Sequence, residues 1–206
     1  MTLKHVLDGY RVLDITQYLA GPAATNLMVQ LGAEVIKVEL APIGDMTRIL
    51  PVLKNGRSSY FLQQNRGKKS LCLDVRKPAA KGILEDLVRQ CDVLVENYSA
   101  GVIGRMGLSW ERVHELNPRL VMCSISGFGQ TGPLSTKPGY DAVAAAYAGV
   151  LDLIGYPDGR PLFPQLAIGD GTTGVHALAA ISTALLYRER SGEGQYLDIS
   201  LLDSYF

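Results

Sequence analysis

The sequence lacks the long apolar segments that a membrane protein would carry. No run approaches the roughly 18 consecutive apolar residues of a transmembrane helix, and the opening stretch MTLKHVLDGY has no apolar core of a secretory signal. The composition, 47% hydrophobic and 19% charged, is that of a folded chain. We therefore expect a soluble, cytoplasmic protein with no membrane partner.

An excess of charge of one sign is also missing. The 20 Lys and Arg residues balance the 20 Asp and Glu residues, so the formal net charge is zero. No global field favours a nucleic acid, and we expect no nucleic-acid partner. Any anionic ligand has to be held by a local site.

Cysteine and histidine are scarce and scattered. Cys72, Cys91 and Cys123 are odd in number and form no C-x-x-C pair, which is typical of reduced thiols rather than a disulfide framework. The three histidines form no H-x-x-x-H pair, so we expect no metal site. The G-x-S-x-G turn of hydrolases is absent, and nothing here favours a Ser-His-Asp triad.

What the chain does have is a regular alternation of strand-like and helix-like segments. The expected strands cover 10–16, 33–39, 70–75, 92–97, 119–126 and the stretch from 194. The expected helices cover 22–32, 78–91, 140–155 and 172–190, with two short ones in 100–117. Residues 40–68, punctuated by Pro and Gly, indicate an extended loop region. This alternation predicts an α/β fold with a Rossmann-like parallel sheet and helices on both faces.

Ligands of parallel sheets bind at the carboxyl ends of the strands. Polar residues follow the predicted strands at 16–17, 74–76 and 97–98, and a glycine loop follows at 127–132. We therefore expect a site at this edge of the sheet. For each position taken alone, the alternative is a residue that merely caps or turns the chain.

The glycine loop matches the G-x-G-x-x-G pattern of dinucleotide-binding folds, and Asp152 lies twenty residues beyond Gly132. That fingerprint needs its third glycine at the start of a helix, where the pyrophosphate binds. Here Pro133 follows at once, and the next helical pattern starts near Tyr140. The context predicts a loop and argues against a nicotinamide cofactor.

Several collinear blocks together resemble the family III CoA-transferases, the CaiB/BaiF family. They include LDITQYLAGPAATNLMVQLGAEVIKVE, NRGKKSLCLD, DVLVENY, SGFGQTGP and IGDGTTGVHALAAISTALLYRERSGEGQ. The resemblance implies coenzyme A as substrate, a Rossmann-like large domain, a small second domain and an interlinked homodimer. Family chains are much longer, so we expect residues 1–206 to be the CoA-binding domain, truncated before the small domain.

The resemblance implies that Asp170, in AIGDGTTG, is the catalytic nucleophile. The flanking Gly169 and Gly171 suggest a bare backbone that a thioester could approach. A helix starting near Thr172 would keep the carboxylate ionised. Without the resemblance, the plainer interpretation of Asp170 is a helix N-cap.

The resemblance also implies a set of coenzyme A contacts. They are Gln17, Leu73, Asp74, Arg76, Asn97, Tyr98, Arg105 and Tyr140. Arg105 and Arg76 would lie near phosphate groups. Ser99 and Leu40 depart from positions that are basic in family members, so the lysines of NRGKK either supply the missing charge or are simply solvated.

One position separates the transferases from the racemases of the same family. The racemases have a histidine in GHD, and Tyr140 takes its place in GYD. A phenol with a reference pKa of about 10 is a poor base at neutral pH. We therefore predict a CoA-transferase acting on an acyl-CoA and a carboxylic acid, without a metal. The alternatives are an α-methylacyl-CoA racemase-like proton transfer and an inactive CoA-binding fragment.

Overall fold

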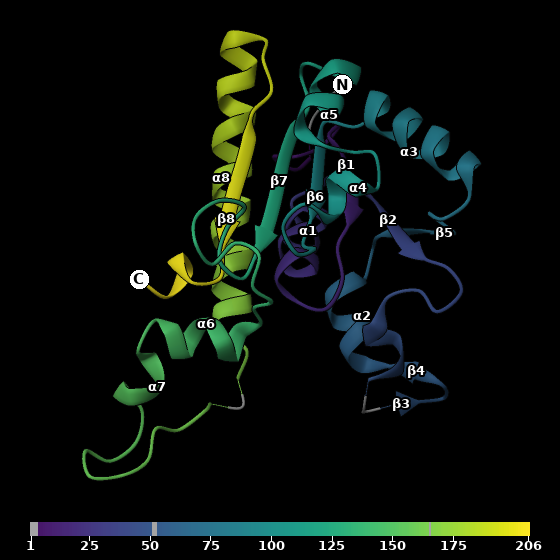
Figure 1. The fold of residues 1–206 in the computed structure, drawn as a ribbon. Coiled ribbons are helices and arrows are strands. Elements are labelled where there is room, and N and C mark those ends of the chain that lie inside the picture. Colours follow the sequence, from purple (N-terminus) through teal and green to yellow (C-terminus); the bar gives the residue numbers. More distant parts are fainter. Residues whose placement is uncertain (1–3, 51–52, 165) are drawn as a thin grey trace.

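A six-stranded parallel sheet forms the centre of the molecule (Figure 1). The computed structural model describes residues 4–50, 53–164 and 166–206. The sheet has the order β5-β2-β1-β6-β7-β8. Its strands are β1 Arg11–Ile15, β2 Glu34–Leu40, β5 Lys69–Leu73, β6 Val93–Glu96, β7 Val121–Ser126 and β8 Tyr196–Ser200. This order is that of the doubly wound Rossmann sheet and reverses between β1 and β6, which confirms the predicted fold class.

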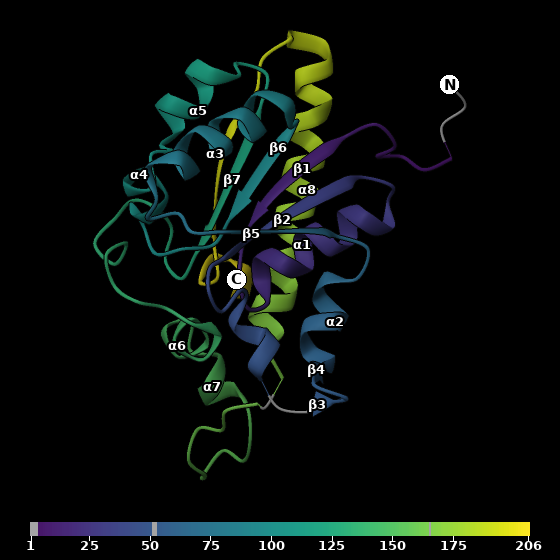
Figure 2. The same ribbon diagram turned by 90° about the vertical axis from the view of Figure 1, so that its right-hand side faces the viewer.

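Helices cover both faces of the sheet (Figure 2). One face carries α1 Ala20–Gln30 and α8 Ile168–Ser191, and the other carries α3 Pro78–Gln90, α4 Val102–Arg105 and α5 Trp110–Leu116. The strands are apolar on both sides, so Val12 and Val93 pack toward α1 and α8, whereas Leu13 and Leu94 pack toward α3 and α5. None of the helices in the described ranges is long and apolar enough to cross a membrane.

The segment 40–68 is not the extended loop that its Pro and Gly content predicted. It contains a 3-10 helix η1 (Met46–Ile49), the antiparallel pair β3 (Leu53–Lys54) and β4 (Arg57–Ser58), and α2 (Ser59–Asn65). Asn55 and Gly56, with φ of 52° and 71°, form the tight turn of this hairpin. The Asp45 side chain caps η1, and the Ser58 hydroxyl caps α2. The turn residues and the two capping side chains can be identified in the sequence. They determine the local structure more strongly than the glycine content of the segment does.

Two predicted helices differ in their bounds. The expected helix over 140–155 is divided into α6 (Asp141–Tyr147) and α7 (Val150–Leu153), because Gly149 adopts φ +76° between them. The expected start of α8 near Thr172 is wrong, since the helix begins at Ile168. The C-terminal stretch is confirmed as a strand followed by a helical turn, η2 (Asp203–Tyr205).

Candidate functional site

A cleft of about 430 Å³ lies at the carboxyl ends of β1, β6 and β7. It is lined by five of the nine residues expected in the site: Gln17, Asn97, Tyr98, Tyr140 and Asp170. They come from four segments that are far apart in the sequence. The cleft occupies the point where the strand order reverses, which is the position at which open α/β sheets bind ligands.

Two polar residues join β1 to β6 at the floor of this cleft. The Gln17 backbone N–H donates to Asn97 Oδ1 at 2.8 Å, and Asn97 Nδ2 donates to the Gln17 carbonyl at 2.7 Å. Tyr18, the next residue, has a φ of +64° and also lines the cleft. A bulky residue in the left-handed region costs about 1–3 kcal/mol and is found mainly at functional sites. The turn after β1 is thus held in an unfavourable conformation that faces the cleft.

Asp170 lies in the first turn of α8 and is half-buried at the cleft wall. Burial, together with the nearby charge of Asp141, raises the pKa of Asp170 to about 7. We expected the helix end to keep this carboxylate ionised, whereas burial and the charge of Asp141 act in the opposite direction. The N-cap interpretation is wrong, since the N-cap residue of α8 is Ala167.

The two glycines beside Asp170 have different roles. A Cβ on Gly169 would collide with Asp141 Oδ1 and with the ring of Tyr205. A Cβ on Gly171 would meet nothing within 4 Å. The shared role expected for both glycines is therefore corrected: Gly169 is needed for internal packing, and only Gly171 leaves open space beside the carboxylate.

Three of the expected contacts lie outside the cleft, at the end of edge strand β5. Arg76 and Asp74 form an ion pair with each other at 2.7 Å, and the Arg76 side chain is exposed. The Leu73 carbonyl accepts a hydrogen bond from the Ala41 backbone N–H at 3.1 Å. The structure thus places these residues together outside the cleft, with β2 lying between β5 and β1 in the sheet.

Arg105 is the remaining predicted contact. It is exposed at the end of α4, whose first residue, Val102, lines the cleft. Ser99 lines the cleft as well, whereas Leu40 ends β2 on the β5 side of the sheet.

Several cleft residues were missed by sequence reasoning, among them Tyr18, Tyr60 and Lys137. Tyr60 enters the cleft from α2, and burial together with the charge of Asp170 raises its pKa. Lys137 enters from the loop before α6. The Asn-Gly turn and the Ser58 cap could have placed Tyr60 on a helix, but no signal pointed to Lys137.

The glycine loop is confirmed as a loop. No helix begins between Gly127 and Gly139, and the next helix starts at Asp141. A Cβ on Gly127 would stand 2.7 Å from the Cα of Gly139, so these glycines allow two backbone segments to touch. The three glycines of the loop match a dinucleotide fingerprint in spacing, but here Gly127 serves close packing at the cleft, whereas Gly129 and Gly132 adopt positive φ values in the loop.

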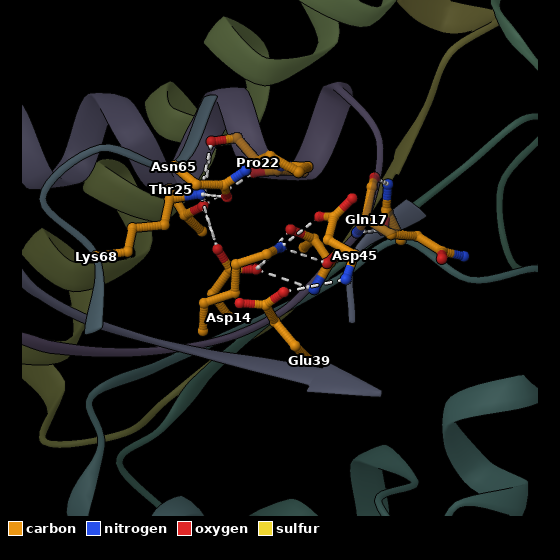
Figure 3. Close-up of polar contacts among 12 residues, drawn as sticks. Asp14, Gln17, Pro22, Thr25, Glu39, Asp45, Asn65 and Lys68 are labelled. Atoms are coloured by element: carbon orange, nitrogen blue, oxygen red, sulfur yellow. Dashed lines mark hydrogen bonds and ion pairs between the residues drawn. The ribbon is translucent and has the colours of Figure 1, made fainter. Parts of the chain in front are cut away.

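A buried network of charges lies beside the cleft (Figure 3). Lys68 Nζ contacts Asp14 Oδ2 at 2.9 Å, and Lys37 Nζ contacts Asp45 Oδ2 at 2.9 Å. The side chains of all four are at most 2% exposed. Lys68, from the NRGKK tract, is therefore neither solvated nor free for a phosphate group. This corrects both interpretations for that lysine.

The network also fixes the backbone that leads into the cleft. Lys37 Nζ donates to the Thr16 carbonyl at 2.7 Å, and the Thr16 backbone N–H donates to Asp14 Oδ1 at 2.9 Å. Burial by itself would raise the pKa of Asp14, but the charges of Lys37 and Lys68 outweigh it and hold the pKa well below its usual value. The ionised network thus supports the turn that presents Gln17.

No group of three or more His, Cys, Asp or Glu side chains within the described ranges is placed to hold a metal ion. The chemistry available at the cleft is that of a half-buried carboxylate, phenols, amides and a lysine. The fold and this cleft define a Rossmann-like domain with a candidate ligand site at the switch point of its sheet.

The chain belongs to CoA-transferase family III, whose family model matches residues 7–206. It is 46% identical over 199 residues to the succinyl-CoA:glutarate CoA-transferase of Mus musculus, covering 96% of this chain and 46% of that protein. It is 45% identical over 202 residues to the formyl-CoA:oxalate CoA-transferase of Streptomyces coelicolor, covering 98% and 48%. The chain spans about half the length of the curated relatives it matches.

Solved structures agree with this assignment. A CaiB/BaiF family protein from Brucella suis superposes with a TM-score of 0.93 at 38% identity. The match covers 98% of this chain and 55% of that one. The resemblance read from the sequence blocks is thereby confirmed at the level of family and fold.

Proposed function

We propose that the protein transfers CoA between an acyl-CoA and a carboxylic acid, with Asp170 as the covalent nucleophile. The observation that carries this proposal is the place of Asp170: a half-buried carboxylate at the switch-point cleft of a family III CoA-transferase chain. We further propose, from the family resemblance, that the complete protein works as a cytoplasmic homodimer.

The proposed reaction has four acyl-transfer steps, and none of them needs a cofactor. A carboxylate oxygen of Asp170 attacks the thioester carbonyl, the C–S bond breaks, and CoA leaves as a thiolate. The thiolate attacks the Asp170 carbonyl of the mixed anhydride, releasing the first carboxylate and leaving an aspartyl-CoA thioester. The acceptor carboxylate attacks the Asp170 carbonyl of this thioester and displaces CoA as a thiolate, which forms a second mixed anhydride. The thiolate then attacks the acceptor acyl carbonyl of that anhydride, which gives the new acyl-CoA and frees the Asp170 carboxylate.

The environment of Asp170 suits this sequence of steps. A pKa raised to about 7 leaves a substantial ionised fraction at neutral pH. It also makes the ionised carboxylate more basic than an exposed one, which favours attack on a carbonyl carbon. Burial of the cleft wall limits the access of water, which would hydrolyse either covalent intermediate.

The predicted coenzyme A contacts complete the proposal. Gln17, Asn97, Tyr98 and Tyr140 line the cleft and would surround the thioester arm. Arg105, exposed on α4, would pair with a phosphate group of the substrate. Leu73, Asp74 and Arg76, at the end of β5, would contact the nucleotide portion.

Replacing Asp170 by Asn tests the assignment in the full-length protein. The amide has nearly the same size but cannot form the anhydride, so acyl transfer should be lost while CoA binding persists. Hydroxylamine should convert the wild-type adduct to a hydroxamate on the peptide that contains Asp170, and mass spectrometry would locate it. Transfer retained by Asp170→Asn, with deamidation excluded by the same measurement, would contradict the mechanism.

Deuterium exchange separates the transferase from the racemase alternative. A methyl-branched acyl-CoA is incubated in D₂O with no acceptor acid. The proposed transferase should leave the α-proton unexchanged. Exchange at the α-carbon without an acceptor would favour the racemase.

A further inference from the structure

Asp141, Tyr205 and Gly169 form a chain of hydrogen bonds directly beside Asp170. Tyr205 Oη donates to Asp141 Oδ1 at 2.6 Å, and the Gly169 backbone N–H donates to Tyr205 Oη at 3.1 Å. Because an amide N–H can only donate, the hydroxyl must accept it and direct its own proton to Asp141. Three elements, α6, η2 and α8, therefore meet at this one hydroxyl.

The packing around this chain is tight. Gly169 is buried, and any side chain there would collide with Asp141 and Tyr205. Asp141 is 7% exposed, and its Oδ2 has no hydrogen-bond partner among the described residues. A buried carboxylate oxygen without a hydrogen-bond donor lowers the stability of the folded state. The presence of such an oxygen beside Asp170 therefore needs an explanation other than stability.

The charged and titratable groups around Asp170 come from several elements. Tyr60 from α2, Tyr140 at the start of α6 and Lys137 from the preceding loop line the same cleft. Tyr18 and Tyr98 line it as well, and Tyr205 from η2 and Asp141 from α6 lie beside Asp170. Among these groups, Asp141 is the carboxylate whose charge opposes ionisation of Asp170.

We propose that Asp141 and Tyr205 are positioning residues for the nucleophile. Tyr205 fixes the first turn of α8 through its hydrogen bond with Gly169, and the charge of Asp141 makes the Asp170 carboxylate a stronger base and nucleophile. The inference rests on the proposed function, since it takes Asp170 to be the attacking group. Tyr205 thus determines the position of the Asp170 carboxylate, and Asp141 determines its basicity.

Two substitutions in the full-length protein separate these roles. Asp141→Asn keeps an oxygen to accept from Tyr205 and removes the charge. Tyr205→Phe keeps the ring and removes the hydroxyl that links α6 to α8. Asp203→Asn, an exposed charge loss within η2, is the matched control.

The first measurement is the titration of the Asp170 carboxyl by ¹³C NMR, with its signal assigned by its loss in Asp170→Asn. In Asp141→Asn the midpoint should fall by about one pH unit, as expected when a nearby like charge is removed. In Asp203→Asn it should stay at the wild-type value. An unchanged midpoint in Asp141→Asn would overturn the electrostatic part of the proposal.

The second measurement is the rate of acyl-Asp170 adduct formation as a function of pH. Asp141→Asn should shift the acidic limb of this profile to lower pH. Tyr205→Phe should slow adduct formation about tenfold or more at every pH, because a nucleophile that is out of position reacts much more slowly. Wild-type rates in Tyr205→Phe would overturn the positioning role.

The outcomes distinguish this inference from the proposed function. If the wild-type protein forms no adduct at all, Asp170 is not the nucleophile and the proposed function fails. If the wild type forms the adduct and both variants match it in rate and midpoint, only the roles of Asp141 and Tyr205 are wrong. Should Tyr205→Phe fail to fold, the isosteric Asp141→Asn still decides the electrostatic part of the proposal.

Discussion

Asn97 holds both the backbone N–H and the backbone carbonyl of Gln17, at 2.8 Å and 2.7 Å, across the boundary between β1 and β6. A single side chain thus links the segments that follow β1 and β6, two strands that pair directly at the reversal of strand order. The turn that carries Gln17 and the strained Tyr18 depends on this pair. The ligand cleft and the sheet are therefore stabilised by the same two hydrogen bonds.

Replacing Asn97 by Ala should lower both stability and CoA binding. The backbone groups of Gln17 lose their partner, which we expect to cost about 1–3 kcal/mol of unfolding free energy. Asn117→Ala is the matched control, because the Asn117 side chain also bonds backbone groups, donating to the carbonyls of Val88 and Cys91 away from the cleft. Urea unfolding and calorimetric CoA titration should show similar destabilisation of both variants and weaker binding only for Asn97→Ala. Equal CoA affinity of the two variants would contradict the role of the pair in the cleft.

Arg105→Ala should weaken CoA binding by about 1.5–3 kcal/mol, the value of a charge-assisted contact to a phosphate. Its exposure on α4 means that stability should hardly change. Arg89→Ala, which removes an exposed guanidinium from α3, is the control. Dephospho-CoA, used beside CoA in calorimetry, tells which phosphate is bound. An unchanged affinity of Arg105→Ala for both ligands would remove Arg105 from the site.

Much of the fold could be predicted because its signals are local and repeated. Apolar runs such as 92–97 and 119–126 are buried on both sides, so they identify parallel strands without any knowledge of their neighbours. The ends of these predicted strands are enough to bring Gln17, Asn97 and Tyr98 to one edge of the sheet. The resemblance added Asp170 and Tyr140, which lie on helix starts and carry no strand-end signal.

What the sequence could not provide depends on contacts between distant residues. The pKa of Asp170 is set by burial and by Asp141, twenty-nine positions away, whereas the sequence shows only the helix that follows. Lys68 looked like a surface lysine because its partner, Asp14, lies 54 residues earlier. Gly169 looked like a glycine that exposes its backbone, and only the packing of Tyr205 shows the opposite.

Lys37→Met should destabilise the protein strongly. It removes the cation that contacts Asp45 and holds the Thr16 carbonyl, and leaves buried carboxylate charge without compensation. Breaking a buried pair in this way costs about 3–5 kcal/mol. Lys69→Met, whose side chain is 67% exposed and pairs with Glu34, should cost less than about 1 kcal/mol. Comparable urea midpoints for the two variants would show that the network adds no stability.

Glu96→Gln should improve stability more at high pH than at low pH. Burial raises the pKa of Glu96 to about 7, above its reference value of 4.5. Between these two values the unfolded chain releases its proton first, so the folded state loses stability as pH rises through this window. The amide never ionises. The unfolding free energy of Glu96→Gln relative to wild type should therefore rise by about 1–3 kcal/mol from about pH 5 to about pH 8.

Urea unfolding at both pH values measures this gain. The difference between variant and wild type cancels the contribution of Asp170, which titrates in the same window. Glu193→Gln, at an exposed position, should show no such dependence. A constant difference between Glu96→Gln and wild type at the two pH values would place the Glu96 carboxyl in a better solvated environment.

Gly171→Ala and Gly169→Ala should have opposite effects on the folded protein. A methyl group at 171 enters open space, and replacing a helical glycine by alanine should add up to about 1 kcal/mol of stability. The same methyl group at 169 would collide with Asp141 and Tyr205, so Gly169→Ala should be destabilised and lose the hydrogen bond to Tyr205. If the thioester approaches Asp170 over Gly171, Gly171→Ala should form the acyl adduct more slowly although it is more stable. Thermal melts and adduct rates measured on the same samples test both halves, and a Gly171→Ala variant with wild-type adduct rates would show that the thioester arrives from another side.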